Sequence, residues 1–276
     1  MKYIVKYEST LETVNLTKSP FICKDIQPLF EEETKYTATN YIFNDRSFIN
    51  NFYFEGNEKK LEIQILGNSK AELLNHLEYI FNYDRNSLKP GRLYVNDNYA
   101  YCYFISSSPE NFNRFFSLET VTYKIYFCSK WIKEKVYDFN IEHEYENKGN
   151  FKYPHSYPFS YNAVKKVKHI INDHYCSCKA KIEFYGPCVN PSIIIGENTY
   201  SIDTELIENE KLEIDPFEKT VIKYTNDGTA IDCMNYRYKK NSVFSEIKTG
   251  LNICHINGRF ACRVILYMER SIPEWK

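Results

Sequence analysis

The residues best suited to bind a metal ion lie close together between positions 169 and 178. They offer two imidazoles and two thiols within ten residues: His169, His174, Cys176 and Cys178. These are ligand types that Zn²⁺ prefers. The spacing favours another interpretation, because a Cys-x-Cys pair in a strand lacks the knuckle of roughly two to four residues that zinc sites use. We therefore expect a β-hairpin with its turn at Asn172-Asp173-His174, and no bound metal.

Paired carboxylates are the second kind of candidate, because glycoside hydrolysis needs two acids about 5 to 9 Å apart across a cleft. Three sets could be proposed: Glu31 to Glu33, Asp203 with Glu205, and Glu213 with Asp215. A sequence does not show whether two of them lie at that distance across a cleft, and we favour solvated faces or loops. The sequence has no Gly-rich phosphate loop and no nucleophile elbow. We expect no catalytic residue, no cofactor-binding residue, no cofactor and no enzymatic activity.

A stripe of tyrosines is the third candidate. Tyr99, Tyr101 and Tyr103 share one face of an expected strand. Aromatic faces can stack on sugar rings, and tyrosine tolerates partial exposure. Interfaces between subunits are enriched in tyrosine for the same reasons. The stripe is therefore a sugar platform, a subunit contact or a layer of the core.

Composition narrows the class of protein. A length of 276 residues suggests two domains, since one domain takes roughly 150 residues. Aromatic residues make up 17% of the chain and favour half-buried strands. Lys plus Arg number 35 against 36 for Asp plus Glu, so no net positive field attracts phosphate and we expect no specific nucleic-acid binding. The nine cysteines are scattered through strand-like segments, and we expect reduced thiols in a cytoplasmic setting.

Segments that would direct the chain to a membrane are not expected. The N-terminus alternates polar and apolar residues and lacks the apolar core, roughly 7 to 15 residues long, of a signal peptide. No stretch approaches the ~18 uninterrupted apolar residues of a membrane-spanning helix. We therefore expect no export signal and no membrane partner.

The elements of the first half are mostly strands. Alternating residues predict strands near 2–7, 11–16, 46–54, 60–66 and 120–139, and a strand or a hairpin with its turn at Asn96-Asp97-Asn98 over 92–105. Residues 19–40 show little periodicity and predict a long loop or extended arm. One helix is predicted over 69–83, where Leu73, Leu74, Leu77, Ile80 and Phe81 form an apolar stripe. Ser69 and Glu72 predict a capping box at its start.

The second half predicts a β-sandwich. Charge, glycine and prolines without an apolar period indicate a linker at 142–158, so we place the boundary between residues 1–147 and 148–276. Short strands with turn signals between them are typical of two packed antiparallel sheets. They are expected near 179–185, 192–195, 199–203, 211–214, 220–224 and from 260 onward.

The order of these elements resembles the distal tail protein family of siphophages and related tail-like particles, in which the protein is the baseplate hub. In the first half the resemblance rests on RSFINNFYFEG, KKLEIQILG and SKAELLNHLEYIFN, followed by PGRLYV, YAYCYFISS and TVTYKIYFCSKWI. In the second half it rests on CKAKIEFYGPCVNPSIIIG, KLEIDPFEKTVIKYTNDGTAIDCMNY and FSEIKTGLNICHI. The chain departs from the family at Asn172-Asp173-His174, where many members have an Asn-x-Gly turn.

The resemblance implies a mainly β protein with one helix in a ring-forming N-terminal tail domain, followed by a galectin-like or jelly-roll C-terminal β-sandwich. It implies a structural virion component, a hexameric ring that connects the tail tube to the tail fibre or tail-associated lysin. Assembly would take place in the host cytoplasm and the mature location would be the tail tip. The alternative is a carbohydrate-binding module that contributes to adsorption on host cell-wall carbohydrate.

Overall fold

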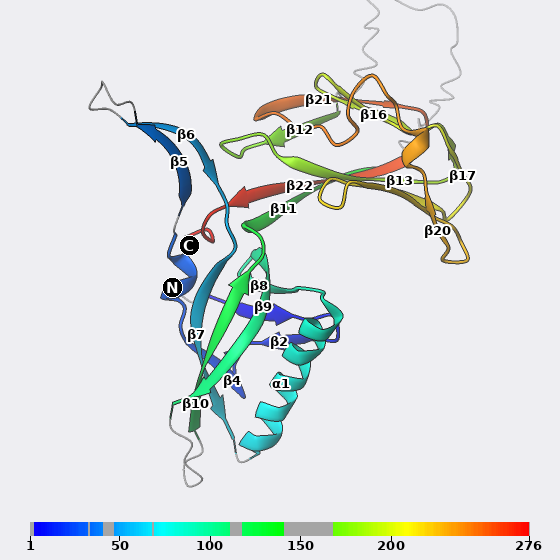
Figure 1. Ribbon diagram of the computed structural model, residues 1–276. Coiled ribbons are helices and arrows are strands. Elements are labelled where there is room, and N and C mark those ends of the chain that lie inside the picture. Colours follow the sequence, from blue (N-terminus) through cyan, green and yellow to red (C-terminus); the bar gives the residue numbers. More distant parts are fainter. Residues whose placement is uncertain are drawn as a thin grey trace, which may run out of the picture. The chain divides into compact units, whose positions relative to one another are not determined.

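The computed structural model describes residues 3–32, 34–40, 47–67, 69–110, 118–140 and 168–275 (Figure 1). The chain divides into two compact units. Unit 1 comprises Met1–Lys133 and Glu269–Lys276, and unit 2 comprises Glu134–Met268. Two strands, β11 (Trp131–Phe139) and β22 (Ala261–Arg270), each run from one unit into the other. The expected linker at 142–158 and the boundary at 147/148 lie outside the described residues.

Unit 1 is an antiparallel sheet structure with one helix. Its strands are β1 (Val5–Glu8), β2 (Thr13–Asn15), β3 (Thr17–Lys18), β4 (Phe21–Asp25), β5 (Lys35–Asn40), β6 (Ser47–Tyr53), β7 (Asn57–Leu66), β8 (Gly91–Val95), β9 (Asn98–Pro109) and β10 (Leu118–Phe127). Strands β9, β10, β7, β4 and β3 are neighbours in that order, while β8 pairs with β9 and with β1. The apolar face of this sheet and the helix α1 (Lys70–Ser87) enclose the core of the unit.

The strand β7 shows how the alternating pattern becomes one wall of that core. Leu61, Ile63 and Ile65 are fully buried, while the residues between them are partly exposed. Their neighbours across β10 include Val121 and Tyr123, which are also buried. The alternating pattern therefore predicts this strand correctly, because one face of the sheet packs against the core and the other faces solvent.

The segment 19–40, expected as a long loop or extended arm, divides into three parts. β4 pairs with β7, the 3-10 helix η1 (Gln27–Phe30) buries Leu29 and Phe30, and β5 pairs with β6. The loop interpretation is wrong for residues 21–30, and an extended arm describes residues 35–40. The buried side chains of 21–30 have no period because tertiary pairing with β7, and not a repeating pattern, holds them in place.

The helix α1 begins at the predicted residue but without the predicted cap. Ser69 occupies the N-cap position with φ −97° and ψ 44°, and its side chain makes no capping hydrogen bond. A capping residue normally has extended backbone, which directs its oxygen over the first turn. The ψ of Ser69 departs from that geometry, so the capping-box prediction is wrong. The helix extends to Ser87, beyond the predicted end at 83, and Leu88 follows in the left-handed conformation with φ 54°.

The buried carboxylate of Asp84 connects the end of α1 to the start of the sheet by hydrogen bonds. Asp84 is 1% exposed and accepts hydrogen bonds from Tyr7 Oη at 2.7 Å, Ser9 Oγ at 2.8 Å and Thr10 Oγ1 at 2.8 Å. The Tyr7 ring needs Gly91 beside it, because a Cβ at position 91 would lie 2.2 Å from the Tyr7 hydroxyl. Hydroxyl donors replace the water that the carboxylate loses on burial.

Unit 2 is a sandwich of two sheets. Its further elements are β12 (Lys168–Asn172), β13 (Lys179–Tyr185), β14 (Cys188–Val189), β15 (Ser192–Ile195), β16 (Asn198–Ser201), β17 (Glu205–Leu206), β18 (Lys211–Asp215), β19 (Thr220–Tyr224), β20 (Ala230–Asp232), the 3-10 helix η2 (Met234–Tyr236) and β21 (Gly250–Asn257). One sheet has the order β20-β19-β18-β13-β22-β11 and the other β12-β21-β15-β16 (Figure 1). A core of residues from both sheets fills the space between them. The predicted mainly β fold with one helix and a C-terminal β-sandwich is confirmed.

The predicted hairpin at 172–174 is wrong. β12 pairs with β21, whereas β13 pairs with β18 and β22 in the opposite sheet. Residues 173–178 therefore cross from one sheet to the other. Asn172 is fully buried at this crossing, where its amide donates to the Ile247 carbonyl at 2.9 Å and its oxygen accepts the His174 N–H at 3.0 Å. The Asx turn is present, but it redirects the chain across the sandwich.

The face of β13 and β18 that points away from the core carries alternating charges. Glu183 and Glu213 are direct cross-strand partners, an arrangement that is repulsive by itself. Lys211 Nζ lies 3.4 Å from Glu183 and 2.9 Å from Glu213, and Lys181 Nζ lies 2.8 Å from Glu213. Burial raises the pKa of Glu213, but hydrogen bonds from Lys181 and Lys211 outweigh burial and lower it below its ordinary value.

Replacing Asp84 with alanine is expected to lower the free energy of unfolding of unit 1 by about 3 kcal/mol, because three hydroxyl groups lose a charged acceptor inside the protein. Urea titration followed by the fluorescence of the buried Trp131 measures the effect. Asn86→Ala, at an exposed position of the same helix, is the matched control. An equal stability of the two variants would contradict this role of Asp84.

Replacing Lys211 with methionine is expected to destabilise unit 2 by about 1 kcal/mol at pH 7. Because the folded-state pKa of Glu213 is lowered, its stabilisation is present above the unfolded value of about 4.3 and is lost as the pH falls through the folded value. The difference between the variant and the original protein should therefore shrink at low pH. Urea midpoints from circular dichroism at neutral and acidic pH measure it, with the exposed Lys240→Met as control.

Candidate self-assembly surface

The potential metal ligands do not converge. His174 Nδ1 lies 3.2 Å from Cys176 Sγ, whereas Cys178 Sγ lies 3.4 Å from the Asn172 side-chain oxygen. His169 is exposed on β12 opposite Ile253. Across the described ranges, no group of three or more His, Cys, Asp or Glu residues could hold a metal ion. The Cys-x-Cys pair instead belongs to the crossing between the two sheets.

The carboxylate sets lie in different settings. Glu213 is flanked by two lysines that keep it ionised, so it is a poor proton donor at neutral pH. The Asp215 carboxylate accepts the N–H of Phe217 at 2.8 Å and thus orders the turn after β18. Asp203 and Glu205 are exposed near β17. Of the acidic run, Glu31 and Glu32 are exposed, and Glu33 lies outside the described residues.

The tyrosine stripe is only partly accessible. Tyr99 is 4% exposed and belongs to the packed interior. The Arg92 guanidinium lies 5.2 Å from the centre of the Tyr99 ring and 5.4 Å from that of Tyr101. These cation–π contacts occupy the aromatic faces that a sugar would need. The stripe is therefore better described as a structural layer than as a sugar platform.

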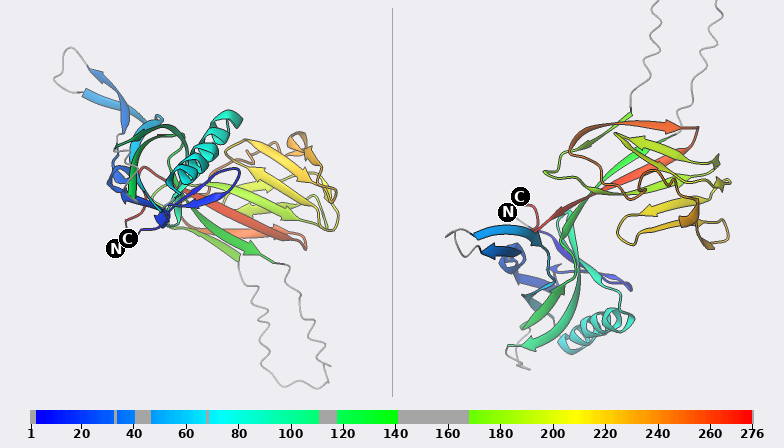
Figure 2. Two further views of the ribbon diagram at one scale, coloured as in Figure 1. Left: turned by 90° about the horizontal axis from the view of Figure 1, so that it is seen from below. Right: turned by 45° about the horizontal axis from the view of Figure 1, so that its top comes forward.

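The most distinctive surface of unit 1 is the ribbon, which we define as β5 and β6. The two strands pair with each other in a separate sheet (Figures 1 and 2). Their described side chains are exposed along both strands, and the large apolar ones are Tyr36, Phe48, Ile49, Phe52 and Tyr53, between 44% and 60% exposed. Only Lys35 is charged among the residues of the two strands. An isolated two-stranded ribbon in water is marginally stable at best.

A signal for this surface is present in the sequence of β6. The register with β5, which shifts at a bulge beside Asn50, places Phe48 and Tyr53 on one face of the ribbon and Ile49 and Phe52 on the other. A strand that is apolar on both faces is normally buried on both, yet the side chains of β6 are exposed on both faces. The sequence predicts the strand but does not reveal this exposure. The partner strand β5 lies in the segment for which only an extended arm is predicted.

A second exposed aromatic surface lies on α1. Tyr79 and Tyr83 are one helical turn apart and are 61% and 42% exposed. Leu88, directly after the helix, is 81% exposed. We call these three residues the helix patch. Exposed aromatic side chains one turn apart on a helix are typical of protein–protein contact sites.

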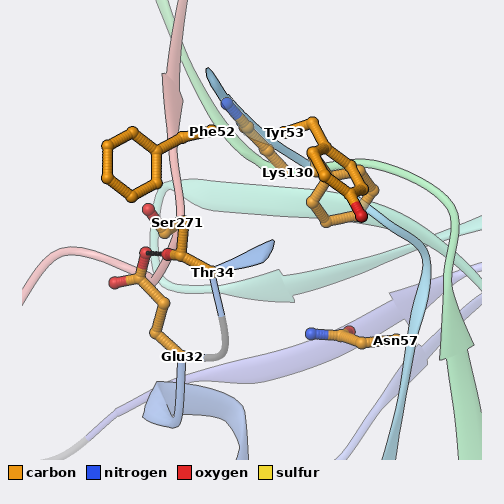
Figure 3. Close-up of a pocket in the computed structure, with 8 residues that line it drawn as sticks. Glu32, Thr34, Phe52, Tyr53, Asn57, Lys130 and Ser271 are labelled. Carbon is orange, nitrogen blue, oxygen red and sulfur yellow. Dashed lines mark hydrogen bonds between the residues drawn. The ribbon is translucent and has the colours of Figure 1, made fainter. Parts of the chain in front are cut away.

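A pocket opens at the root of the ribbon, where β6 leads into β7 (Figure 3). Aromatic residues at the end of β6, Phe52 to Phe54, form part of its lining. Glu32, Thr34 and Ser271 contribute a carboxylate and two hydroxyl groups. Hydrogen bonds from Ser271 and Thr34 lower the pKa of Glu32, so that carboxylate stays ionised near neutral pH. The sequence could not indicate this pocket, because its residues come from distant parts of the chain.

No helix in the described part of the chain is long and apolar enough to span a membrane.

Comparison with known proteins identifies the fold. No protein-family model and no curated protein matches the sequence. Among solved structures, the Dit protein of phage SPP1, described as a hub adsorption apparatus in phages that infect Gram-positive hosts, matches with a TM-score of 0.59 and 10% identity over 96% of this chain and 98% of that chain.

Two chains from the phage P2 baseplate in its activated conformation are also similar. The structure with Ca has a TM-score of 0.69 and 12% identity, covering 99% of this chain and 100% of that chain. The structure with Sr has a TM-score of 0.66 and 12% identity, covering 98% and 99%. The resemblance to the phage distal tail protein family is thus confirmed at the level of the fold, over almost the whole chain.

Proposed function

We propose that this chain is a structural component of a phage-type tail tip and that it assembles with copies of itself into a closed ring. The observation that carries the proposal is the ribbon, whose large apolar side chains are between 44% and 60% exposed on both faces. Burial of such side chains stabilises association by roughly 25 cal/mol for each Å² removed from water. The likeness to phage hub and baseplate structures supports the same role.

A closed ring requires two different surfaces on each subunit, which meet head to tail. The ribbon and the helix patch meet this requirement, because both expose aromatic side chains and both belong to unit 1. We assign the ribbon as one half of the contact and the helix patch as the other. Six copies are expected from the resemblance, with the tail tube on one side and the tail fibre or tail-associated lysin on the other. Such a ring would assemble in the host cytoplasm and remain in the virion.

A scaffold of this kind needs no catalytic group. Of the acids considered above, Glu213 is paired with lysines and Asp215 orders a turn. The proposal therefore assigns the chain no enzymatic activity, no cofactor and no specific contact with nucleic acid.

The double variant Phe48→Ser with Ile49→Ser is expected to remain monomeric under conditions in which the original chain forms rings, because the ribbon loses its central apolar pair. Native mass spectrometry and negative-stain imaging measure the assembly. Leu251→Ser, which changes an apolar residue of unit 2 that is 67% exposed, is the matched control and should assemble normally. Rings of the double variant would contradict the role of the ribbon.

A mixing experiment tests the head-to-tail arrangement. A chain with the defective ribbon and a chain with Tyr79→Asp and Tyr83→Asp should each be monomeric. Mixed together, they retain one good ribbon and one good helix patch, so they should form a heterodimer and stop there. Native mass spectrometry with one chain isotopically labelled distinguishes this dimer. Full rings from the mixture, or no association at all, would exclude this pairing of surfaces.

A further inference from the structure

The pocket at the root of the ribbon has the chemistry of a ligand site, and this inference does not depend on ring formation. Figure 3 shows the polar groups and aromatic rings arranged around one open space. The pocket is open to solvent and its cavity volume is about 80 Å³. This is below the roughly 300 to 1,000 Å³ of sites that enclose drug-sized ligands, so the pocket suits only a small group bound at its open mouth. The lining residues come from the segment after η1, from β6 and β7, from the connection after β10 and from the residue after β22.

One side of the pocket is an organised hydrogen-bond acceptor. Thr34 Oγ1 donates to Glu32 Oε1 at 2.7 Å, and the Ser271 hydroxyl lines the same pocket. The Thr34 hydroxyl orients the carboxylate and leaves acceptor positions available, since an ionised carboxylate offers about four. The geometry favours a ligand that presents O–H or N–H donors.

The other polar groups of the pocket are available to a ligand. The Lys130 ammonium, the Asn57 amide and the Tyr53 hydroxyl line the same space, and within the described ranges none of them has a hydrogen-bond partner. Together they supply donors and acceptors. The single negative charge of Glu32 is balanced by Lys130, so the pocket has no net charge to attract an anion or a cation.

Aromatic rings provide the apolar part of the lining. Phe52 is 60% exposed, and Tyr53 and Phe54 are 44% and 39% exposed. Rings that are accessible in this way can pack against the C–H face of a sugar ring, and tyrosine adds a polar edge. A carboxylate, an amide and an ammonium beside such rings match a ring of hydroxyl groups with an apolar face.

We propose that this pocket binds a neutral hexopyranose unit of a saccharide. The ring would pack on the aromatic residues, and its hydroxyl groups would donate to Glu32 and exchange hydrogen bonds with Asn57 and Lys130. All residues of this site belong to unit 1. A single unit in an open pocket is expected to bind with a dissociation constant in the roughly millimolar range.

Saturation-transfer NMR and calorimetry with glucose, N-acetylglucosamine, maltotriose and chitotriose test the proposal on the full chain. Saturable binding of at least one neutral probe is expected, and a trimer that binds more tightly than its monosaccharide would indicate a polymer as the source. Asn57→Ala and Lys130→Ala should each weaken binding about five-fold or more, the loss of one hydrogen bond. Lys60→Ala, at an exposed position of β7 outside the pocket, should leave it unchanged.

The ribbon variant Phe48→Ser with Ile49→Ser separates this proposal from the proposed ring, because neither residue lines the pocket. Binding that persists in the monomeric variant supports the site even if rings never form. Absence of saturable binding in both states, or binding that ignores Asn57→Ala and Lys130→Ala, would overturn it. Tighter binding of the anionic sugar N-acetylneuraminic acid would also overturn it. If the pocket variants fail to assemble into rings of subunits and no sugar binds, the pocket would instead be the binding site for a side chain of a neighbouring subunit.

Discussion

A β-ribbon of two strands has no second layer of its own, and side chains such as Tyr36 and Phe52 are more than half exposed in the part of the chain that the structure describes. Unit 1 has a well-packed core elsewhere, and the exposure is therefore confined to particular elements. Unit 1 thus combines a packed core with a ribbon whose apolar side chains are exposed. A chain that exposes aromatic residues on a projecting element is suited to association, and the helix patch offers a surface of the same kind.

The ribbon depends on the part of unit 1 that carries it. β6 leads directly into β7, whose ten residues pair with β10, and β5 follows η1, which buries Leu29 and Phe30. On the other side of the core, the Asp84 hydrogen bonds hold α1 against β1. The helix patch and the root of the ribbon are thus each attached to a firmly packed element. Rigid attachment reduces the entropy that association must overcome.

Much of the fold can be predicted from local sequence patterns, and each wrong prediction has an identifiable physical cause. β13, β15 and β19 occupy the predicted positions, because short apolar or alternating runs bounded by turn residues form strands. The crossing after Asn172 was missed, since an Asx turn looks the same in a sequence whether the chain returns to its own sheet or moves to the other. β4 was missed because its position depends on pairing with β7. The pocket joins Glu32, Lys130 and Ser271, whose proximity is created only by the tertiary fold.

The division of the chain imposes an order on its biosynthesis. Residues Glu269–Lys276 belong to unit 1. There the Trp275 ring stacks on the Phe30 ring with centres 4.3 Å apart. Glu274 Oε2 lies 2.5 Å from Lys133 Nζ. Domains of many proteins fold one after another as they leave the ribosome. Here the first unit to emerge is the last to be completed, because its final segment is translated after the whole sandwich. A nascent chain therefore has no complete unit 1 until the ribosome has translated this segment.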